Sequence, residues 1–273
     1  MDLRQVSCNL CLGSDFEPYL ESSSCGRRLL RCRECGLVAA MGGSDSDSQT
    51  DAPKTPGTPR DPRTDQRRAA AVMRILQSGK ILEIGCGRGG FLAALDPKQY
   101  GVVGVEALPA DAFEARRKLK QCGSAGAILE GSVTDGHLTT ESFDLVAMFG
   151  SVAHCPSPRA TFMEVSRLLK PGGYAVIETP GLSSLTARIF GTRWPPLSDP
   201  SAGFFFTAST LERLAMTCGL TAGAVRLTLP IGWPTPGTLV YVARKTGDLC
   251  KSPLLGDLTP KVTRITPMGA TGI

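Results

Sequence analysis

Short apolar runs alternate with amphipathic segments along most of the chain. Five of these runs have the length and composition of buried strands, and they fall at residues 81–84, 101–106, 127–131, 143–150 and 174–180. Helical segments recur around them, and the predicted helices fall at residues 66–77, 109–121 and 158–169. Strands that alternate with helices at this interval form a parallel sheet with helices on both faces. The pattern therefore predicts an α/β fold.

The last part of the pattern predicts how this sheet ends. A helix is expected over residues 210–218, with Ser209 and Glu212 as a capping box. Two β-rich runs follow at residues 220–230 and 238–245. We expect these two runs to close the sheet as a hairpin.

Composition divides the chain into four segments. Residues 42–65 are rich in Gly, Ser, Asp, Thr and Pro, and such a segment cannot bury enough apolar surface to fold, so we expect a disordered linker there. Residues 246–273 show no periodicity and are expected to form a flexible tail. The expected domains are therefore an N-terminal unit of residues 1–41, the linker, an α/β domain of residues 66–245, and the tail.

The most informative motif joins the first predicted strand to the helix after it. It reads ILEIGCGRGG at residues 81–90, and Gly85, Gly87 and Gly89 supply a turn in which a ligand can approach bare backbone. A dinucleotide-binding loop seats a pyrophosphate with a similar pattern, so the glycines alone do not identify the ligand. Glu83 separates the two cases, because a carboxylate at the strand end repels a diphosphate and suits an ammonium group. A glycine-rich turn without a ligand stays the alternative for this segment alone.

A second carboxylate stands at the end of the next strand. Ligand-binding residues of an open α/β sheet collect at the carboxyl ends of its strands, and Glu106 ends the run GVVGVE at residues 101–106. A carboxylate there can accept hydrogen bonds from both ribose hydroxyls of an adenosine. Glu106 therefore predicts an adenosine-containing ligand, but the same acid would serve NAD and leaves a dehydrogenase open.

Near the N-terminus, four cysteines form two C-x-x-C pairs with twenty residues between them, and they are Cys8, Cys11, Cys32 and Cys35. This spacing is typical of a zinc site, because each pair lets one tight turn point two thiolates at the metal. Segments at residues 16–20 and 28–32 fit a hairpin between the pairs, so we expect a zinc ribbon. Four thiolates leave no open coordination position, which makes the expected Zn²⁺ structural. A redox-active C-x-x-C is the alternative.

The middle and later parts of the chain resemble a known family. FDLVAMFGSVAHCPSPRATFMEVSRLLKPGGYAVIETPG, residues 143–181, is similar to the stretch FDxVxxxxVLEHxxDPxxxLxExxRxLKPGGxxxxxTPN of the class I S-adenosylmethionine (SAM)-dependent methyltransferases, and the glycine-rich loop resembles their motif I. Residues 184–220 resemble a segment of bacterial methyltransferases that carry an N-terminal zinc ribbon. Together these resemblances cover residues 8–36 and 66–245.

The resemblance implies a Rossmann-like fold with a mostly parallel seven-stranded sheet, and SAM as the methyl donor. The glycines of motif I and the two carboxylates already described then belong to the SAM site. The resemblance also implies that Ser132 and Val133 lie beside the adenine and that Gly150 and Ser151 lie beside the methionine part of SAM. The family often carries an acidic residue at the position of Ser132, which this chain lacks.

His154 is the candidate catalytic residue. It is one of two histidines and follows the fourth predicted strand, beside the expected SAM methyl group. A base there would remove the proton that an oxygen or nitrogen acceptor must lose, whereas a histidine that only caps the next loop is the alternative. Ala153 replaces the Glu that usually precedes this histidine, and the segment before Phe204 lacks a His often found there. If either missing residue contacts the substrate, its absence predicts a different acceptor or a loss of activity.

Length and charge limit the classes of protein further. A chain of 273 residues with 42% hydrophobic content can bury a full core. No apolar run approaches the roughly 20 residues that span a bilayer, and the first residues lack the apolar core of a signal peptide, so we expect a cytoplasmic protein. The net charge of +5 is mild, and the densest basic group lies near the cysteines, at Arg27, Arg28, Arg31 and Arg33.

Three functions fit these observations. The first is methyl transfer from SAM to a small-molecule acceptor (a metabolite, lipid or sugar intermediate), with four aromatic residues either near the acceptor or in the core: Trp194, Phe204, Phe205 and Phe206. The second is an rRNA or tRNA methyltransferase whose ribbon and arginines bind RNA, against which the mild net charge counts. The third is a SAM-binding regulator or scaffold without catalysis. The sequence predicts no oligomeric state.

Overall fold

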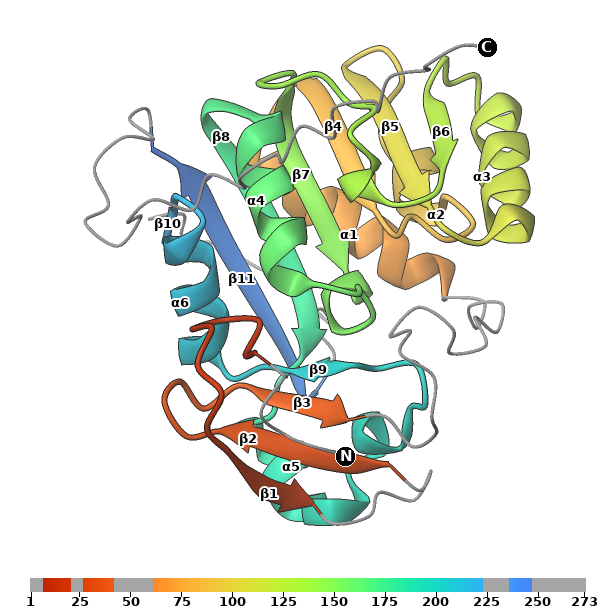
Figure 1. The fold of residues 1–273 in the computed structure, drawn as a ribbon. Helices are drawn as coiled ribbons and strands as arrows, with labels where there is room; N and C mark the ends of the chain where they lie inside the picture. Colours follow the sequence, from red (N-terminus) through yellow and green to blue (C-terminus); the bar gives the residue numbers. More distant parts are fainter. Residues whose placement is uncertain (1–6, 21–26, 42–60, 223–235, 247–273) are drawn as a thin grey trace, which may run out of the picture.

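The computed structural model describes residues 7–20, 27–41, 61–222 and 236–246 (Figure 1). Within these residues the chain forms two β-sheets. The larger sheet has seven strands, which in spatial order are β10 (Leu220–Ala222), β11 (Thr238–Lys245), β8 (Leu169–Pro180), β7 (Phe143–Phe149), β4 (Gly79–Ile84), β5 (Tyr100–Glu106) and β6 (Ala127–Glu130). All five strands predicted for the α/β domain are therefore present.

The strand order confirms a mostly parallel seven-stranded sheet. β8, β7, β4, β5 and β6 run parallel to one another, whereas β11 is antiparallel to both of its neighbours. The chain passes from β4 outward to β5 and β6, and then returns to β7 on the other side of β4. Ligands bind at such a reversal, outside the carboxyl ends of the strands. The expected ligand site therefore lies after β4 and β7.

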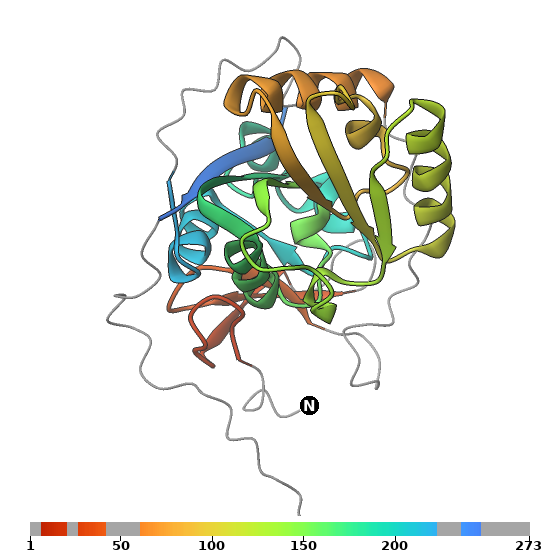
Figure 2. The same cartoon turned by 90° about the horizontal axis from the view of Figure 1, so that it is seen from above.

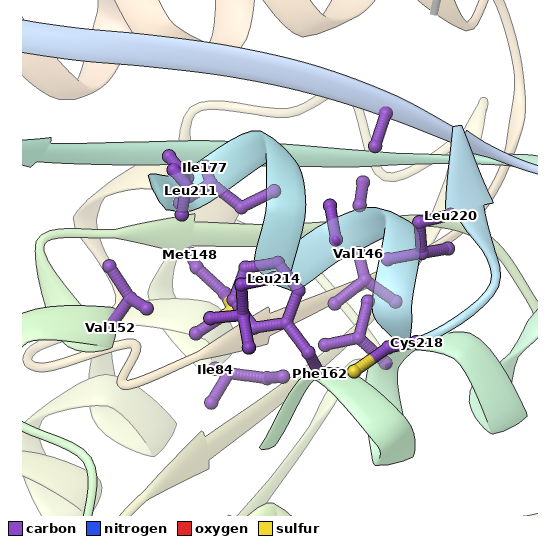
Figure 3. Close-up of a cluster of buried hydrophobic side chains, with 14 of the residues drawn as sticks. Ile84, Val146, Met148, Val152, Phe162, Ile177, Leu211, Leu214, Cys218 and Leu220 are labelled. Carbon is purple, nitrogen blue, oxygen red and sulfur yellow. The ribbon is translucent and has the colours of Figure 1, made fainter. Parts of the chain in front are cut away.

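Helices cover both faces of the large sheet, as the view from above shows (Figure 2). One face carries α1 (Pro62–Ile75), α2 (Gly90–Ala93) and α3 (Pro109–Gln121), and the other carries α4 (Pro158–Leu168) and α6 (Ala208–Thr217). On the second face, Phe162 of α4 and Leu211 and Leu214 of α6 pack against Val146 and Met148 of β7 (Figure 3). This buried apolar cluster fixes the helices that follow the carboxyl ends of β7 and β8.

The start of α1 corrects the sequence prediction. The helix begins at Pro62, four residues before the predicted start, and the carboxylate of Asp61 accepts a hydrogen bond from the amide of Arg63 over 3.0 Å. An Asp followed by Pro is a strong start signal, because Asp caps the first turn and Pro needs no amide partner there. Residues 62–65, which composition assigned to the linker, are therefore part of α1.

Two other element boundaries differ from the prediction. The capping box of α6 is formed by Thr207 and Thr210, not by Ser209 and Glu212: the Thr207 hydroxyl accepts from the Thr210 amide over 3.2 Å, and the Thr210 hydroxyl accepts from the Thr207 amide over 2.9 Å. β8 begins at Leu169, before the glycines that were expected to precede it. Threonine caps a helix as serine does, so the helix begins two residues earlier than predicted, at Ala208.

The smaller sheet confirms the predicted N-terminal hairpin and extends it. Its strands in spatial order are β1 (Phe16–Leu20), β2 (Arg28–Cys32), β3 (Val38–Met41) and β9 (Phe204–Phe205). β9 follows a short helix, α5 (Leu185–Phe190), and belongs to the later part of the chain. Figure 1 shows this sheet at the carboxyl ends of β7 and β8, with β9 as its nearest strand. The N-terminal unit and the α/β domain thus share one sheet.

Several sequence predictions fall outside the described residues. Most of the predicted linker, residues 42–60, and most of the predicted tail, residues 247–273, lie outside the described residues. Residues 223–230 of the predicted closing hairpin lie outside them as well. The described ends of that hairpin, β10 and β11, do pair antiparallel. Among the described residues, no helix combines the length and apolar composition needed to cross a bilayer.

Candidate functional site

The glycine-rich loop after β4 has the backbone conformation that its sequence requires. Gly85, Gly87 and Gly89 have positive φ angles of 71°, 52° and 70°, which L side chains disfavour. A Cβ on Gly85 would lie 2.6 Å from Cβ of Ser151, and a Cβ on Gly89 would lie 3.0 Å from Cβ of Ala115. A Cβ on Gly87 would meet nothing within 4 Å. Two glycines therefore serve packing, and Gly87 faces open space.

Glu106 lies beside this open space. One of its carboxylate oxygens accepts a hydrogen bond from the amide of Gly87 over 2.8 Å, and the other accepts from the amide of Leu108 over 2.9 Å. These bonds fix the orientation of the carboxylate, and each oxygen keeps further acceptor capacity for a ligand. The structure thus brings the two strongest sequence candidates for the donor site, the loop and Glu106, into contact.

A buried carboxylate–arginine cluster lies behind the loop, formed by Asp65, Arg68, Glu83 and Glu178. Arg68 of α1 donates to both carboxylate oxygens of Glu178 at the end of β8, over 2.9 and 2.6 Å, and to Asp65 over 3.3 Å. Burial lowers the pKa of Arg68, but the bonds to Glu178 and the charges of Asp65 and Glu83 raise it above its usual value overall. The guanidinium therefore stays charged inside the protein.

This cluster is in contact with the glycine-rich loop after β4 and with Gly150 after β7. A Cβ on Gly90 would collide with the carboxylate of Asp65, and the carbonyl of Glu178 accepts from the amide of Gly150 over 2.7 Å. One guanidinium faces three carboxylates here, and Glu83 is fully buried. Carboxylates in these surroundings favour a cationic ligand group, whereas the guanidinium is already bound to Asp65 and Glu178 and is not free for a diphosphate. Arg68 and Glu178 have no local sequence signature as a pair, because they are 110 positions apart in the chain.

The candidate site residues that follow β7 and β6 make hydrogen bonds within the protein or are buried. Ser151 donates its hydroxyl hydrogen to the carbonyl of Ile84 over 2.6 Å, which ties the end of β7 to the glycine-rich loop. After β6, the amide of Ser132 donates to the carboxylate of Asp135 over 2.7 Å, and Val133 is buried. Asp135 thus supplies a carboxylate near the position where the chain lacks an acidic residue.

His154 belongs to a polar cluster that the sequence did not reveal, the His154 cluster, formed with Asp199 and Ser201. Nδ1 of His154 lies 3.1 Å from the Ser201 hydroxyl, which donates to Asp199 over 2.6 Å. Nε2 of His154 lies 4.0 Å from the other Asp199 oxygen. The only local signal for this partner was Asp-x-Ser, a pattern that forms the turn seen here, with the Ser201 amide donating to Asp199 over 2.9 Å.

The carboxylate of Asp199 is held in its charged form. Burial alone raises the pKa of Asp199, but the hydroxyl and amide of Ser201 and the positive charges of His154 and Arg27 lower it below its usual value overall. The side chains of His154 and Asp199 are 39% and 42% exposed, so the cluster is open to solvent and to small molecules.

The aromatic residues considered for the acceptor pack in the core instead. Trp194, Phe204, Phe205 and Phe206 are each at most 6% exposed. Phe204 and Phe206 join the cluster on the face of α4 and α6, whereas Trp194 and Phe205 join a separate cluster with residues of the N-terminal unit. In the described structure, core packing is therefore the interpretation that holds.

The four cysteines of the C-x-x-C pairs meet at one point. Their Sγ atoms all lie within 4.8 Å of one another, and the closest pairs, Cys8 with Cys35 and Cys11 with Cys32, are 3.4 Å apart. A disulfide requires about 2.05 Å, whereas sulfurs around zinc at roughly 2.3 Å lie somewhat under 4 Å apart. The hydrogen bond between the first pair lowers the pKa of Cys8 to about 5 and raises that of Cys35. The set therefore fits a tetrahedral metal ion.

Comparison with known proteins agrees with this geometry. Residues 60–224 match the family described as methyltransferase domain, and because this stretch is more than half of the chain, the chain belongs to that family. The sheet order and the glycine-rich loop are those of a class I SAM-dependent methyltransferase, so the resemblance seen in the sequence is confirmed.

Curated relatives include enzymes of one named activity. The chain is 30% identical over 150 residues to the ubiquinone biosynthesis O-methyltransferase of Cereibacter sphaeroides, covering 53% of this chain and 61% of the relative. It is 31% identical over 107 residues to the enzyme of the same name from Pseudomonas aeruginosa, covering 38% of this chain and 45% of the relative. The chain thus spans less than two thirds of the length of these relatives.

Solved structures share the fold at lower identity. A SAM-dependent methyltransferase from Thermotoga maritima is 23% identical with a TM-score of 0.52, covering 68% of this chain and 91% of that one. A protein from Pyrococcus horikoshii is 21% identical with a TM-score of 0.52, covering 67% and 90%. These similarities support the fold.

Proposed function

We propose that the chain is an enzyme that transfers a methyl group from SAM to a small-molecule acceptor. The observation that carries the proposal is the position of Glu106, whose carboxylate lies beside the open backbone of Gly87 with the negatively charged cluster behind the loop. A ribose bound by Glu106 and an ammonium group near the cluster correspond to two polar groups of SAM, its ribose hydroxyls and the α-amino group of its methionine part. A dinucleotide would instead bring its diphosphate to this negative region.

In the proposed SAM site, the loop and the strand ends bind different parts of the ligand. The backbone at residues 85–89 would receive the methionine part, together with Gly150 and Ser151. Glu106 would accept the ribose hydroxyls, and Ser132 and Val133 would border the adenine. Because Glu130 pairs with Glu106 in the sheet, these last two residues follow at the same edge, on the side of the site away from β7.

The His154 cluster is the proposed acceptor end. In the transfer, the bond between the sulfonium and its methyl carbon breaks as a bond forms to an acceptor oxygen, and the acceptor proton moves to His154. The ionised Asp199 would stabilise the imidazolium that results. The enzyme otherwise has to align donor and acceptor. An oxygen acceptor is the class favoured by the names of the curated relatives.

Structural zinc is proposed for the four cysteines, whose positions fit a tetrahedral site. An RNA acceptor has less support, because arginines of the basic group are engaged within the protein: Arg31 and Arg33 pair with carboxylates of the N-terminal unit, and Arg27 binds backbone carbonyls. A cytoplasmic location stays a prediction from the sequence.

Calorimetry tests the donor site directly. We expect SAM and its demethylated product to bind the full chain and NAD to bind far more weakly. Glu106→Ala should weaken SAM binding about tenfold or more, as expected for loss of charge-assisted bonds worth roughly 1.5–3 kcal/mol. Glu114→Ala is the matched control, because Glu114 pairs with Arg117 on the surface of α3. Equal affinity for NAD, or full SAM affinity in Glu106→Ala, would contradict the proposal.

A transfer assay then tests the acceptor. Isotopically labelled SAM is incubated with phenolic and other hydroxylated small molecules, and in parallel with ribosomal and transfer RNA. Label in a small molecule supports the proposal, and label in RNA only would favour the RNA enzyme. SAM binding without transfer to any acceptor class would favour a regulator or scaffold.

A further inference from the structure

The N-terminal unit reaches the acceptor end of the site through Arg27. This residue directly precedes β2, and its guanidinium donates from Nη2 to the carbonyl of Asp199 over 2.6 Å and to that of Ala202 over 2.9 Å. The two carbonyls flank Ser201, so Arg27 closes the turn that presents both partners of His154. Arg31 and Arg33 of the basic group instead pair with carboxylates of the N-terminal unit.

A line of backbone hydrogen bonds connects the same unit to His154 from another side. β3 pairs with β9, with Val38 opposite Phe205, and the amide of Ala40 donates to the carbonyl of Gly203 over 2.9 Å. The amide of Gly203 in turn donates to the carbonyl of Ala153 over 2.7 Å. Ala153 directly precedes His154, so the small sheet fixes the backbone on which the histidine stands.

The turn between Cys8 and Cys11 is bonded to the residues that follow His154. Asn9 accepts a hydrogen bond from the hydroxyl of Ser157, the N-cap of α4, over 2.7 Å. The carbonyl of Leu10 accepts from Arg159 over 2.9 Å, and the amide of Leu10 donates to Sγ of Cys8 over 3.4 Å. A turn whose amide contacts a proposed metal ligand is thus also bonded to the helix that follows His154.

Apolar packing joins the two parts as well. Leu29 and Val38 of the small sheet are fully buried, in one cluster with Trp194, Leu197 and Phe205 from the segment around the His154 cluster. By contrast, the contacts of Glu106 are with Gly87 and Leu108, inside the α/β part. The hydrogen bonds described above between the N-terminal unit and the α/β part therefore all lie at the acceptor end.

We propose that the four-cysteine unit is a positioning element of the acceptor end, with Arg27 as its positioning residue. The metal holds the cysteine turns, the turns and β3 hold the segments on both sides of His154, and Arg27 holds Asp199 and Ser201 opposite it. Loss of the metal or of Arg27 loosens the His154 cluster and leaves SAM binding in place. This inference rests on the proposed function, which assigns one end of the site to the methyl donor and the other to the acceptor.

The test uses the full chain with ¹³C-labelled histidine. Since the chain has two histidines, its spectrum contains one Cε1–H signal from His154 and one from His137, which is the internal reference. Arg27→Ala removes both bonds to the turn and keeps all four cysteines. Arg31→Ala is the matched control, because Arg31 lies on β2 and pairs with Glu17 inside the N-terminal unit.

In Arg27→Ala, and after metal removal by a chelator, we expect the His154 signal to shift or broaden while the His137 signal stays. Amide exchange in the peptide of residues 199–205 should accelerate about tenfold or more, and the Kd for SAM should stay within about twofold of its original value. Arg27→Lys should restore part of the protection, since both bonds come from the single nitrogen Nη2 and an ammonium group also carries several donors on one nitrogen.

An unchanged His154 signal in Arg27→Ala would overturn the inference. A Kd for SAM that rises well beyond the expected twofold limit in this variant would also overturn it. If chelation unfolds the whole chain, the Arg27 variants still decide, because they retain the metal ligands. Failure of the unmodified protein to bind SAM would contradict the proposed function instead. The His154 and exchange signals would then still report whether the unit positions this cluster.

Discussion

The donor end and the acceptor end of the proposed site are assembled over very different sequence distances. At the donor end, Gly87 and Glu106 are 19 positions apart and lie within one strand–helix–strand unit. At the acceptor end, His154 and Ser201 are 47 positions apart, and Arg27 and Asp199 are 172 apart. A site made within one such unit has a local sequence signature, whereas a site assembled from three distant segments has none.

The two ends also differ in burial, which decides how each responds to substitution. Arg68 and Glu178 behind the donor loop have side chains that are 7% and 10% exposed, whereas those of His154 and Asp199 are 39% and 42% exposed. Charges interact more strongly where water is excluded. We therefore expect substitutions in the buried cluster behind the donor loop to affect mainly folding stability, and substitution of the exposed His154 to affect mainly catalysis.

The largest stability effect is expected for Arg68→Ala. Removing the guanidinium leaves buried carboxylates without their counter-charge, which should lower the free energy of unfolding by about 3–5 kcal/mol in denaturant titrations. Arg117→Ala is the control, since its pair with Glu114 is exposed and should contribute about 0.5 kcal/mol or less. Equal losses for the two variants would remove the predicted contrast in burial.

His154→Gln should show the opposite behaviour. With an acceptor from the transfer screen, kcat should fall about 100-fold, the usual contribution of a general base, while the Kd for SAM and the unfolding free energy change little. A smaller loss is expected for Ser201→Ala, because the hydroxyl contacts the imidazole without taking the proton. If kcat is unchanged in His154→Gln, the histidine only caps its loop.

Two alanine substitutions separate packing from ligand access within the donor loop. Gly87→Ala adds a methyl group into open space, so SAM affinity should fall on the order of tenfold, about 1.4 kcal/mol, with a stability cost of roughly 1–2 kcal/mol from its positive φ. Gly85→Ala places its methyl group against Ser151 and should lose more stability than Gly87→Ala. The reverse ranking, measured by calorimetry and thermal unfolding, would contradict the loop geometry.

The smallest effect concerns the pH dependence of stability at the acceptor end. The folded-state pKa of Asp199 is lowered, so its carboxylate stabilises the fold above the unfolded value of about 3.9, and this contribution disappears as the pH falls through the folded pKa. Asp199→Asn should therefore be less stable than the original chain near neutral pH, by a small margin given its exposure. The margin should vanish in strong acid, and a margin that grows on acidification would contradict the assignment.

The sequence predicted the elements whose residues are close together. The five parallel strands, the glycine-rich loop, Glu106 at a strand end, and the cysteine pairs with their hairpin all follow from local periodicity and spacing. Element ends were less predictable: α1 begins at Pro62, and α6 is capped by Thr207. Neighbouring residues can cap a helix equally well, and packing of the whole helix selects between them.

By itself, then, the sequence determined the α/β class, the kind of ligand loop and the four-cysteine set, because hydrophobic period and residue spacing act within a few turns of chain. Tertiary structure alone decided that β9 joins the small sheet, that Arg68 meets Glu178, and that Asp199 and Arg27 gather around His154. These contacts depend on how strands are ordered and layers packed, and pairing between distant segments leaves no period in the sequence to detect.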